Sequence, residues 1–464
     1  MGLFMQTNSA CSRVVNMTKR ILFVFAPAGP PIDYAMPKIA AKAEITTYIL
    51  YPPPEYNLNV IQQYSASVHD ISNLPLNEAL NTLDELVADG SFDGIFTFSE
   101  FLLMSISKIA KTNNLRGVGE NVYKARNKVT MRECWDNVGV PQPKFAHVSN
   151  SENAEQACAN LELPFVLKSA YGAGSIGLQV VSELSNFNMQ LSELVRAVEQ
   201  ARQQGKHEFE EQDDFPSIIA EEMIVASTEP WYETNKYGNF VSIEGLVVDG
   251  VYKPLAMTGR FPTIEPFTEL GNIAPSVMSG ENKSNILDVV TTAIDALELE
   301  NCATHTELKL LPNGTVNLLE TAARMGGVAI AQELDVAFGL DYVGLYIDTL
   351  LGTTENIPSF EQNPTGNSAA SLALIATDST GKPWKSKRRF CDIDWSELLV
   401  GETTTAHVIT SQSMPFDNDF PEYDLAGGVM NYAGQLFIKA ETPENLLNSA
   451  YSVLDQLEYK LPDA

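Results

Sequence analysis

The stretch HTELKLLPNGTVNLLETAARMGG, residues 305–327, decides how the middle of this chain folds. Its Asn313-Gly314 pair is a strong signal for a β-hairpin, because both central residues of a type I′ turn need positive φ. With that pair at the tip, counting outward places Glu307 opposite Glu320, with Cβ atoms about 5 Å apart. Like charges in such a pair destabilise a sheet, so something must offset their repulsion.

A divalent cation held between these two carboxylates would remove the repulsion. Mg²⁺ in proteins is commonly bound by one or two carboxylates together with substrate phosphates, so Glu307 and Glu320 are the candidate metal ligands. The alternative is that both side chains point into water and their repulsion is tolerated. Arg324 and the Gly326-Gly327 pair follow shortly after. A guanidinium and bare backbone N–H groups would then converge on a bound phosphoryl or carboxylate group.

The composition is that of a globular protein rather than a disordered one, with 44% hydrophobic and 19% charged residues. At 464 residues the chain is too long for one ordinary core, and two or three domains are expected. Its formal net charge of −29 would repel a nucleic-acid backbone or an anionic membrane. We therefore expect small-molecule partners, and neither a nucleic acid nor a membrane.

The cysteines and the first strand-like run indicate a cytoplasmic protein. The five cysteines are scattered and show neither a Cys-x-x-Cys motif nor a metal-ligand spacing. An odd number without a framework favours reduced thiols. The apolar run ILFVFAPA at 21–28 is far too short to span a bilayer, and its surroundings lack the order of a secretory signal.

Three regions with different patterns follow one another. Over 18–124, short apolar strands alternate with helical patterns, which predicts a doubly wound parallel α/β domain; the loop glycines do not form the G-x-G-x-x-G motif of a dinucleotide site. The region 125–355 is richer in strands and hairpins, including one over 241–259 that is predicted to turn at Asp249-Gly250. A linker-like segment at 355–370 leads into short strands and a final helix over 442–459, with Thr442 as N-cap and Pro443 in the first turn. We therefore expect 356–464 to be a small α+β domain.

Two further motifs of the middle region suit a nucleotide. Lys168 ends a predicted strand and precedes the glycine-rich SAYGAGSIG, residues 169–177, so that a fixed positive charge would lie beside loop N–H groups able to cover phosphates. The alternative is an ordinary hairpin, and the residue order excludes a Walker A loop. Lys128 lies on the helix that opens the region, and Glu221-Glu222 closes a strand. Taken alone, these would be a solvated helix face and an exposed strand end.

The order of these features resembles the ATP-grasp superfamily. A helix lysine, a lysine before a glycine-rich hairpin, a strand ending Glu-Glu-x-Ile, and Glu-x12-Glu-x3-Arg-x-Gly-Gly follow one another within 125–350. The resemblance is to the carboxylate–amine ligase branch, including the L-amino acid ligases that form dipeptides. It implies an ATP-grasp fold of mixed α/β and α+β class, preceded by the parallel α/β domain and followed by the small C-terminal domain.

The resemblance also implies a role for each motif residue. ATP would be the phosphoryl donor, with two Mg²⁺ ions that Mn²⁺ could replace, and similar ligases are commonly homodimers. Lys168 would be the catalytic cation on the phosphates and Arg324 the one on the transferring phosphoryl group, while Glu307 and Glu320 would hold the metal. The residues implied to bind ATP are Lys128, Lys168, Ser175, Glu221, Glu222, Met223 and Ile224. Those implied to bind substrate are Glu269, Asn272, Gly326 and Gly327.

Some positions depart from the family pattern. Asn272 stands where the amino-acid ligase branch often has His, and Asn cannot titrate. Ala322 stands where many members carry an Asn as a third metal ligand. Val328 replaces what could be a bulkier side chain, which suggests a roomier acceptor site.

His305 is either a partner of the metal site or an ordinary hairpin histidine. The candidates for the ribose-binding carboxylate are Glu229, Glu233 and Glu244.

The function expected from these features is ATP-dependent ligation of a carboxylate to an amine, most simply between two amino acids. The carboxylate would attack the γ-phosphorus of ATP to give an acyl phosphate and ADP, and the amine would then displace phosphate. Two alternatives stay open. One is another ATP-grasp chemistry on bicarbonate or a non-amino-acid carboxylate, and the other is a nucleotide-binding protein that does not turn ATP over.

Overall fold

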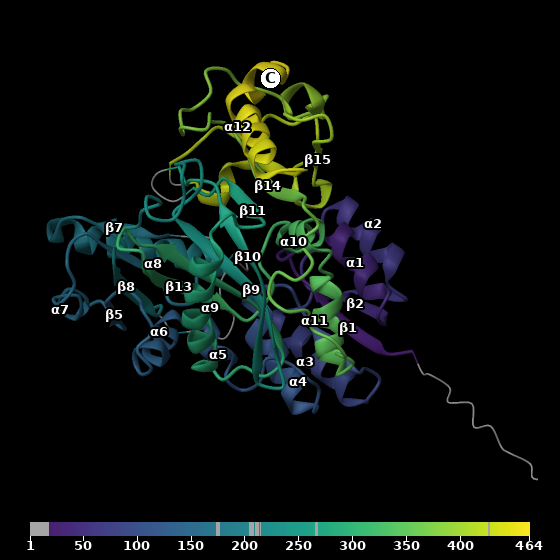
Figure 1. Cartoon of the computed structure of the whole chain (residues 1–464). Coiled ribbons are helices and arrows are strands. Elements are labelled where there is room, and N and C mark those ends of the chain that lie inside the picture. The colour runs from purple at the N-terminus through teal and green to yellow at the C-terminus, as the bar shows by residue number, and fades with distance from the viewer. Residues whose placement is uncertain are drawn as a thin grey trace, which may run out of the picture.

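The computed structural model describes residues 18–172, 177–203, 208, 213, 215–264, 268–425 and 427–464. These residues form three β-sheets with helices packed around them. Figure 1 shows the N-terminal helices on one side of the central strands, the small sheet that contains β5 and β8 on the other, and the C-terminal residues above. No helix of the described residues combines the length and apolar character needed to cross a membrane.

The N-terminal sheet is parallel and has helices on both faces. Its strands, in the order β3-β2-β1-β4, are Ser67–Asp70, Glu44–Ile49, Arg20–Phe25 and Gly94–Phe96. Phe23 packs with α1 (Ile32–Ala40) and α2 (Glu55–Tyr64), whereas Leu22 and Val24 pack with α3 (Leu76–Ala88) and α4 (Leu103–Thr112). Alternate residues of one strand therefore enter two cores, which confirms the doubly wound parallel sheet.

The central sheet has eight strands in the order β13-β12-β9-β10-β11-β14-β16-β15. The strands are β9 Phe240–Val248, β10 Val251–Arg260, β11 Gly271–Ala274, β12 Cys302–Leu310, β13 Val316–Ala322, β14 Ser368–Ile375, β15 Thr405–Val408 and β16 Tyr432–Ala440. The β9–β10 hairpin turns at Asp249-Gly250, whose φ angles of +51° and +76° suit a two-residue type I′ turn. This is the turn that the sequence predicts.

The β12–β13 hairpin pairs Glu307 with Glu320, as predicted, but its turn differs from the expected type I′. Leu311 N–H donates to Thr315 O at 2.9 Å, which makes Pro312, Asn313 and Gly314 a three-residue loop, and of these three only Gly314 has positive φ, +78°. The loop shifts the register by one residue, and a bulge after Leu318 shifts it back. The two glutamates face each other because the two irregularities cancel.

The third sheet is antiparallel, in the order β5-β8-β6-β7. Its strands are Phe145–Val148, Ile218–Glu222, Phe165–Ser169 and Gln179–Val181. The helices α5 (Val122–Arg126) and α6 (Lys128–Asp136) precede it, and the short α7 (Ala154–Ala157) and the longer α8 (Phe187–Gln203) flank it. Asn127 caps α6, because its side-chain oxygen accepts from Val129 N and Thr130 N at 2.9 and 3.2 Å.

The C-terminal residues continue the central sheet. An irregular segment precedes β14, and β14 pairs with β11, so β14, β16 and β15 extend the same eight strands. The last helix, α12 (Pro443–Lys460), begins as predicted with Thr442 as N-cap and Pro443 in the first turn. The division at 355 and 356 therefore stays a prediction.

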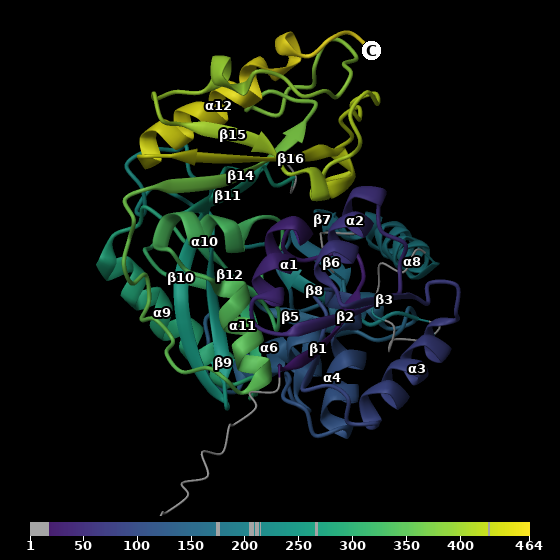
Figure 2. The ribbon, with the colours of Figure 1, turned by 90° about the vertical axis from the view of Figure 1, so that its right-hand side faces the viewer.

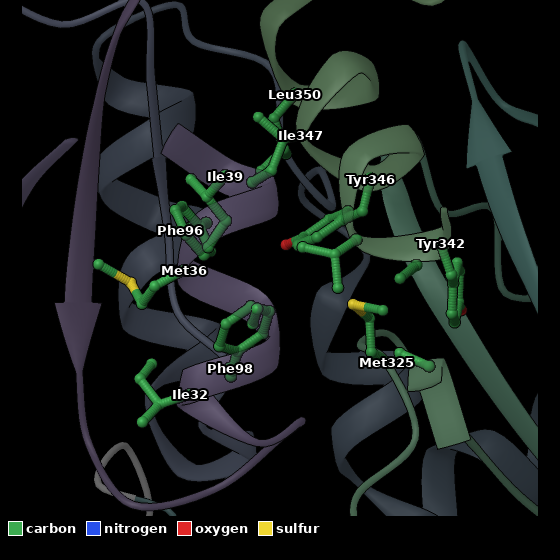
Figure 3. Close-up of a cluster of buried hydrophobic side chains, with 14 of the residues drawn as sticks. Ile32, Met36, Ile39, Phe96, Phe98, Met325, Tyr342, Tyr346, Ile347 and Leu350 are labelled. Carbon is green, nitrogen blue, oxygen red and sulfur yellow. The ribbon is translucent and has the colours of Figure 1, made fainter. Parts of the chain in front are cut away.

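A buried core joins the N-terminal sheet to the rest of the chain. Met36 of α1, together with Phe96 and Phe98, packs against Tyr346 of α11 (Tyr342–Leu351). Figure 3 shows Met325 in the same cluster, and Met325 is directly bonded in sequence to Arg324. The helix α10 (Ile330–Phe338) belongs to the same core, whereas α9 (Gly280–Asp295) packs on the other face of β9 and β10. Figure 2 shows α10 and α11 between the central strands and α1. The N-terminal sheet thus helps to fix the backbone at Arg324.

Candidate active site

A cavity of about 470 Å³ is lined by residues of the β5-β8-β6-β7 sheet, of the eight-stranded sheet and of the segment that precedes α10. Most of the predicted site residues line it, although they lie far apart in the sequence. They are Lys128, Lys168, Glu221, Glu222, Met223, Ile224, Glu269, Asn272, Glu307, Glu320, Arg324 and Gly327. Gly326 does not line it, and Ser175 lies outside the described residues.

The two hairpin glutamates face the same cavity, so they do not point to opposite sides of their ribbon. Each already has cationic neighbours. Lys128 Nζ lies 3.0 Å from Glu320 Oε2, and His305 Nε2 lies 3.2 Å from Glu307 Oε1. Within the described part of the chain, no group of three or more His, Cys, Asp or Glu side chains is placed to hold a metal. Two carboxylates suit Mg²⁺ only if phosphates and water complete its shell.

His305 links Glu307 to a deeper carboxylate. Its Nδ1 lies 2.7 Å from Glu244 Oε1, and Glu244 is 0% exposed. Burial alone would lower the pKa of His305, but Glu244 and Glu307 outweigh it and raise the pKa to about 9. Burial alone would raise the pKa of Glu307, but His305 and Arg260 lower it to about 2. His305 is therefore a charged partner of the candidate metal site rather than an ordinary hairpin histidine.

The structure shows why position 326 requires a glycine. A Cβ at this position would lie 2.8 Å from His305 Nδ1 and 3.1 Å from Glu244 Oε2. Gly326 therefore lets the backbone pack over the His305–Glu244 pair, and its backbone contact with substrate stays a prediction. Gly327 and Val328 do line the cavity, and Val328 has a φ of +56°, which is strained for a β-branched residue.

A buried ion-pair chain fixes Lys168. Its Nζ lies 2.6 Å from Glu221 Oε2, and Arg132 Nε donates to Glu221 Oε1 at 2.7 Å. Burial alone would raise the pKa of Glu221, but these two cations lower it to about 2. Arg132 also donates to the carbonyls of Leu318 and Leu319 at the hairpin bulge, at 3.1 and 2.7 Å. Glu221 is thus placed to orient Lys168 and, through Arg132, to tie β8 to the β12–β13 hairpin, and its contact with ATP stays a prediction.

Lys128 contacts the first residues of the glycine-rich loop. Its Nζ donates to Gly172 O at 2.6 Å, and its own N–H donates to Ala170 O at 2.9 Å. Lys128 is 9% exposed, so the alternative of a solvated helix face is wrong. The neighbouring Arg126 donates to Tyr171 O at 3.0 Å. Two consecutive helices thus hold the start of this loop beside the cavity.

Arg324 is held by Glu100, which the sequence analysis missed. The Arg324 guanidinium pairs with Glu100, which also accepts from Arg126 Nη1 at 2.6 Å. Burial alone would raise the pKa of Glu100, but Arg324 and Arg126 lower it to about 2. Glu100 follows β4 at the carboxyl end of the parallel sheet, where ligands of such sheets commonly bind. That position is the signal that could have identified it.

Further cavity residues were missed because their side chains belong to the long antiparallel strands. Lys309 Nζ donates to Asn239 Oδ1 at 2.8 Å and lies 4.5 Å from the centre of the Phe240 ring, beside Met223 and Ile224 in the cavity wall. None of the three ribose candidates lines the cavity. Glu244 is buried beneath His305, and Glu229 and Glu233 are exposed.

Glu269 and Asn272, the predicted substrate-binding residues, also line the cavity. Glu269 is open to the cavity but surrounded by protein, and burial, with the charge of Glu307, raises its pKa to about 7. Asn272 is 6% exposed and donates from Nδ2 to Ser371 Oγ at 3.3 Å. Among the described residues, Glu269 has no ion pair like those of Glu221 with Arg132 and Lys168, although the charges of Arg260, His305 and Lys309 act on it.

Comparison with known proteins is consistent with this arrangement. The model of the ATP-grasp domain family matches residues 161–332. Alanine–anticapsin ligase of Bacillus subtilis is 31% identical over 300 residues, which cover 64% of this chain and 62% of the relative. The chain thus spans less than two thirds of that relative. An L-arginine-specific L-amino acid ligase of Bacillus subtilis is 22% identical over 360 residues, 75% of this chain and 79% of that protein.

The fold is also similar to a solved structure. The crystal structure of the L-amino acid ligase from Bacillus licheniformis superposes with a TM-score of 0.72 at 20% identity, covering 96% of this chain and 98% of that one. At such identity the likeness concerns the fold alone. Residues 161–332 thus match the ATP-grasp domain family, and the fold of the chain is similar to that of a solved L-amino acid ligase.

Proposed function

We propose that this protein is an ATP-dependent carboxylate–amine ligase that joins two amino acids and releases ADP and phosphate. The observation that carries the proposal is one cavity lined by two kinds of polar group. Lys128, Lys168 and the carboxylates Glu307 and Glu320 suit a nucleotide triphosphate, and Glu269 suits an ammonium group. The names of the relatives, alanine–anticapsin ligase and L-arginine-specific L-amino acid ligase, support amino acids as substrates.

In the first step, a carboxylate oxygen of the first amino acid attacks the γ-phosphorus of ATP. A bond from that oxygen to phosphorus forms and the bond to the β-phosphate bridging oxygen breaks, which gives an acyl phosphate and ADP. Lys168, held by Glu221, would lie on the phosphates, and Arg324, held by Glu100, would neutralise the transferring group. These positions are fixed before substrate binds, so little reorganisation is needed during reaction.

A metal ion fits the same wall. Glu307 and Glu320 would hold Mg²⁺, which when bound would neutralise charge on the β- and γ-phosphates. We propose two ions, with Mn²⁺ as a substitute, and Ala322 leaves phosphate or water to fill the position that an Asn would take. His305 would hold Glu307 ionised for this purpose.

In the second step, the amine of the second amino acid attacks the acyl carbon. The carbon–nitrogen bond forms, the bond from carbon to the phosphate oxygen breaks, and the amine loses a proton. Arg324 and the Gly327 N–H group would receive the oxygens that gain charge. Water must be excluded, because it would hydrolyse the acyl phosphate. Val328 would border the acceptor's side chain.

The test is a phosphate-release screen over all pairs of the twenty amino acids, with mass spectrometry of the products. We expect phosphate release that depends on amino acids. The product should have the summed mass of the two amino acids minus that of one water molecule. Release that depends on bicarbonate or on a non-amino acid instead would favour another ATP-grasp chemistry. ATP binding without release in any mixture would favour a non-catalytic protein.

The finer organisation is also part of the proposal. We take 18–124, 125–355 and 356–464 as the three structural units of the enzyme, and a homodimer in the cytoplasm as its working form. Size-exclusion chromatography with light scattering measures the oligomeric state directly.

A further inference from the structure

Behind the ammonium end of the cavity lies a buried hydrogen-bonded chain of three side chains. Asn272 of β11 and Ser371 of β14 are direct cross-strand neighbours, and Asn272 Nδ2 lies 3.3 Å from Ser371 Oγ. Ser371 Oγ in turn lies 2.5 Å from Glu333 Oε1 on α10, and Ser371 N–H donates to the same oxygen at 3.0 Å. Ser371 and Glu333 are both 0% exposed.

The contacts between Asn272, Ser371 and Glu333 fix which group donates in each hydrogen bond. Glu333 Oε1 already accepts the Ser371 N–H group, so it is an acceptor for the Ser371 hydroxyl as well. A serine has one hydroxyl hydrogen. Once that hydrogen is donated to Glu333, Ser371 Oγ can only accept from Asn272. The Asn272 NH₂ group therefore points toward Ser371, and its carbonyl oxygen is left for the cavity.

This result does not depend on the protonation of Glu333. Burial raises the pKa of Glu333 to about 8. Glu333 Oε1 accepts hydrogen bonds from two donors, whereas Oε2 has no hydrogen-bond partner among the described residues. A proton on this carboxyl therefore occupies Oε2. Oε1 is an acceptor in the acid and in the carboxylate alike. A buried acid without a paired cation is costly, which points to a purpose beyond packing.

We propose that Glu333, acting through Ser371, holds the Asn272 amide with its carbonyl oxygen toward the cavity, where this oxygen and Glu269 together receive the ammonium group of the first amino acid. Both Asn272 and Glu269 line the cavity. An ammonium group has three N–H donors and no acceptor, so it matches a carboxylate beside a carbonyl oxygen. A freely rotating amide would present its NH₂ group half of the time and repel the same ligand.

The inference rests on the proposed ligase function and adds Ser371 and Glu333 to it as positioning residues. The directed carbonyl of Asn272 supplies an acceptor that needs no titration. The selectivity for an ammonium-bearing substrate then depends on Ser371 and Glu333, which do not themselves line the cavity.

The test compares an amino acid with its des-amino analogue in Ser371→Ala. The probe is the amino acid that gives the fastest phosphate release in the wild-type screen, and its analogue lacks only the α-ammonium group and serves as a competitive inhibitor. We expect Ser371→Ala to raise the KM for the amino acid about tenfold, the weight of one hydrogen bond to a charged group. The Ki of the analogue and the KM for ATP should stay within twofold of wild type.

Two further variants separate positioning from packing. Ser368→Ala makes the same change at another buried serine of β14, away from Asn272, and should leave both constants unchanged. Glu333→Gln keeps an acceptor oxygen and should behave as wild type, whereas Glu333→Leu should reproduce Ser371→Ala. An equal rise in the KM of the amino acid and the Ki of its analogue, or no rise in either, would overturn the inference. A wild-type protein without amino-acid-dependent phosphate release would overturn the proposed function itself.

Discussion

The two ends of the cavity solve different electrostatic problems. At the phosphate end, which we define as Lys128, Lys168, Glu221 and Glu320, every carboxylate has a cation close by, and the pKa of Glu221 is lowered to about 2. At the ammonium end, which we define as Glu269, Asn272, Ser371 and Glu333, the links between the side chains are neutral hydrogen bonds. The pKa values of Glu269 and Glu333 are raised to about 7 and 8.

The contrast follows from what each end must receive. A polyanion needs cations that are fixed beforehand, and buried lysines stay charged only when carboxylates accompany them. An ammonium group brings its own positive charge, so an acid that waits for it has no permanent partner. The ion pairs of the phosphate end are thus formed within the protein, whereas the acid of the ammonium end gains its cation only when substrate binds.

The largest effect is expected from removing a charge at the phosphate-transfer centre. Arg324→Ala and Glu320→Ala should each lower kcat about 10²–10³-fold, because a preorganised charge that stabilises the transition state is lost. Phosphate release with saturating ATP and amino acids measures the change. Arg20→Ala, at the exposed start of β1 and outside the cavity, is the matched control and should keep wild-type activity.

Retained activity in a folded Arg324→Ala protein would contradict its role. Thermal unfolding of the variants distinguishes a lost catalytic group from a lost fold, and we expect melting temperatures close to that of wild type.

The next effect tests the contrast between the two ends directly through stability. Glu221→Gln should lower the free energy of unfolding at pH 7 by about 3 kcal/mol, because Arg132 and Lys168 lose the carboxylate that neutralises them in the interior. Glu333→Gln should cost less than about 1 kcal/mol, because the raised pKa of Glu333 already leaves that carboxyl neutral at pH 7. Urea unfolding measures both.

The control for these substitutions is Glu152→Gln, the same change at an exposed position outside the cavity. It should alter the free energy of unfolding by less than about 0.5 kcal/mol. Equal losses in Glu221→Gln and Glu333→Gln would mean that the two ends do not differ in charge state, and the comparison would fail.

A smaller effect is expected from pH at the ammonium end. Glu269 attracts an ammonium group only when ionised, and its pKa is raised to about 7. The KM for the first amino acid should therefore rise as pH falls through 7, by about tenfold for one unit below the pKa. Initial rates between pH 6 and 8 measure this. Glu269→Gln should have a high KM that does not change over this range, and a persistent pH dependence in that variant would assign the titration elsewhere.

The smallest effect on rate, but a visible one on specificity, is expected at Val328. Exchanging Val328 for Trp should narrow the range of amino acids accepted as the second substrate, because Val328 lines the cavity after the Gly-Gly pair. The product profile of the folded variant measures the range. A profile identical to that of wild type would discard the idea of a roomy acceptor site.

Local patterns predicted much of the fold. The parallel N-terminal sheet, the Asp249-Gly250 hairpin, the facing glutamates and the cap of α12 all depend on residues close in sequence. The predicted type I′ turn at Asn313-Gly314 was wrong. The bulge that compensates for the three-residue loop is held by Arg132 of α6, which is far away in the sequence.

The candidate site was predictable only where a motif carried it. Glu100, Arg132 and Glu333 had no motif, since each acts on a residue that the fold brings close from a distant segment. The packing requirement at Gly326 was missed for a related reason. A side chain at position 326 would collide with His305 and Glu244, and nothing in the local sequence shows that this pair lies there.

The most direct test of the account is a crystal structure with a non-hydrolysable ATP analogue and Mg²⁺. We predict Mg²⁺ bound by Glu307 and Glu320 and by phosphate oxygens, with Lys168 on the phosphates. A nucleotide bound in the cavity with no metal ion on either glutamate would contradict the account.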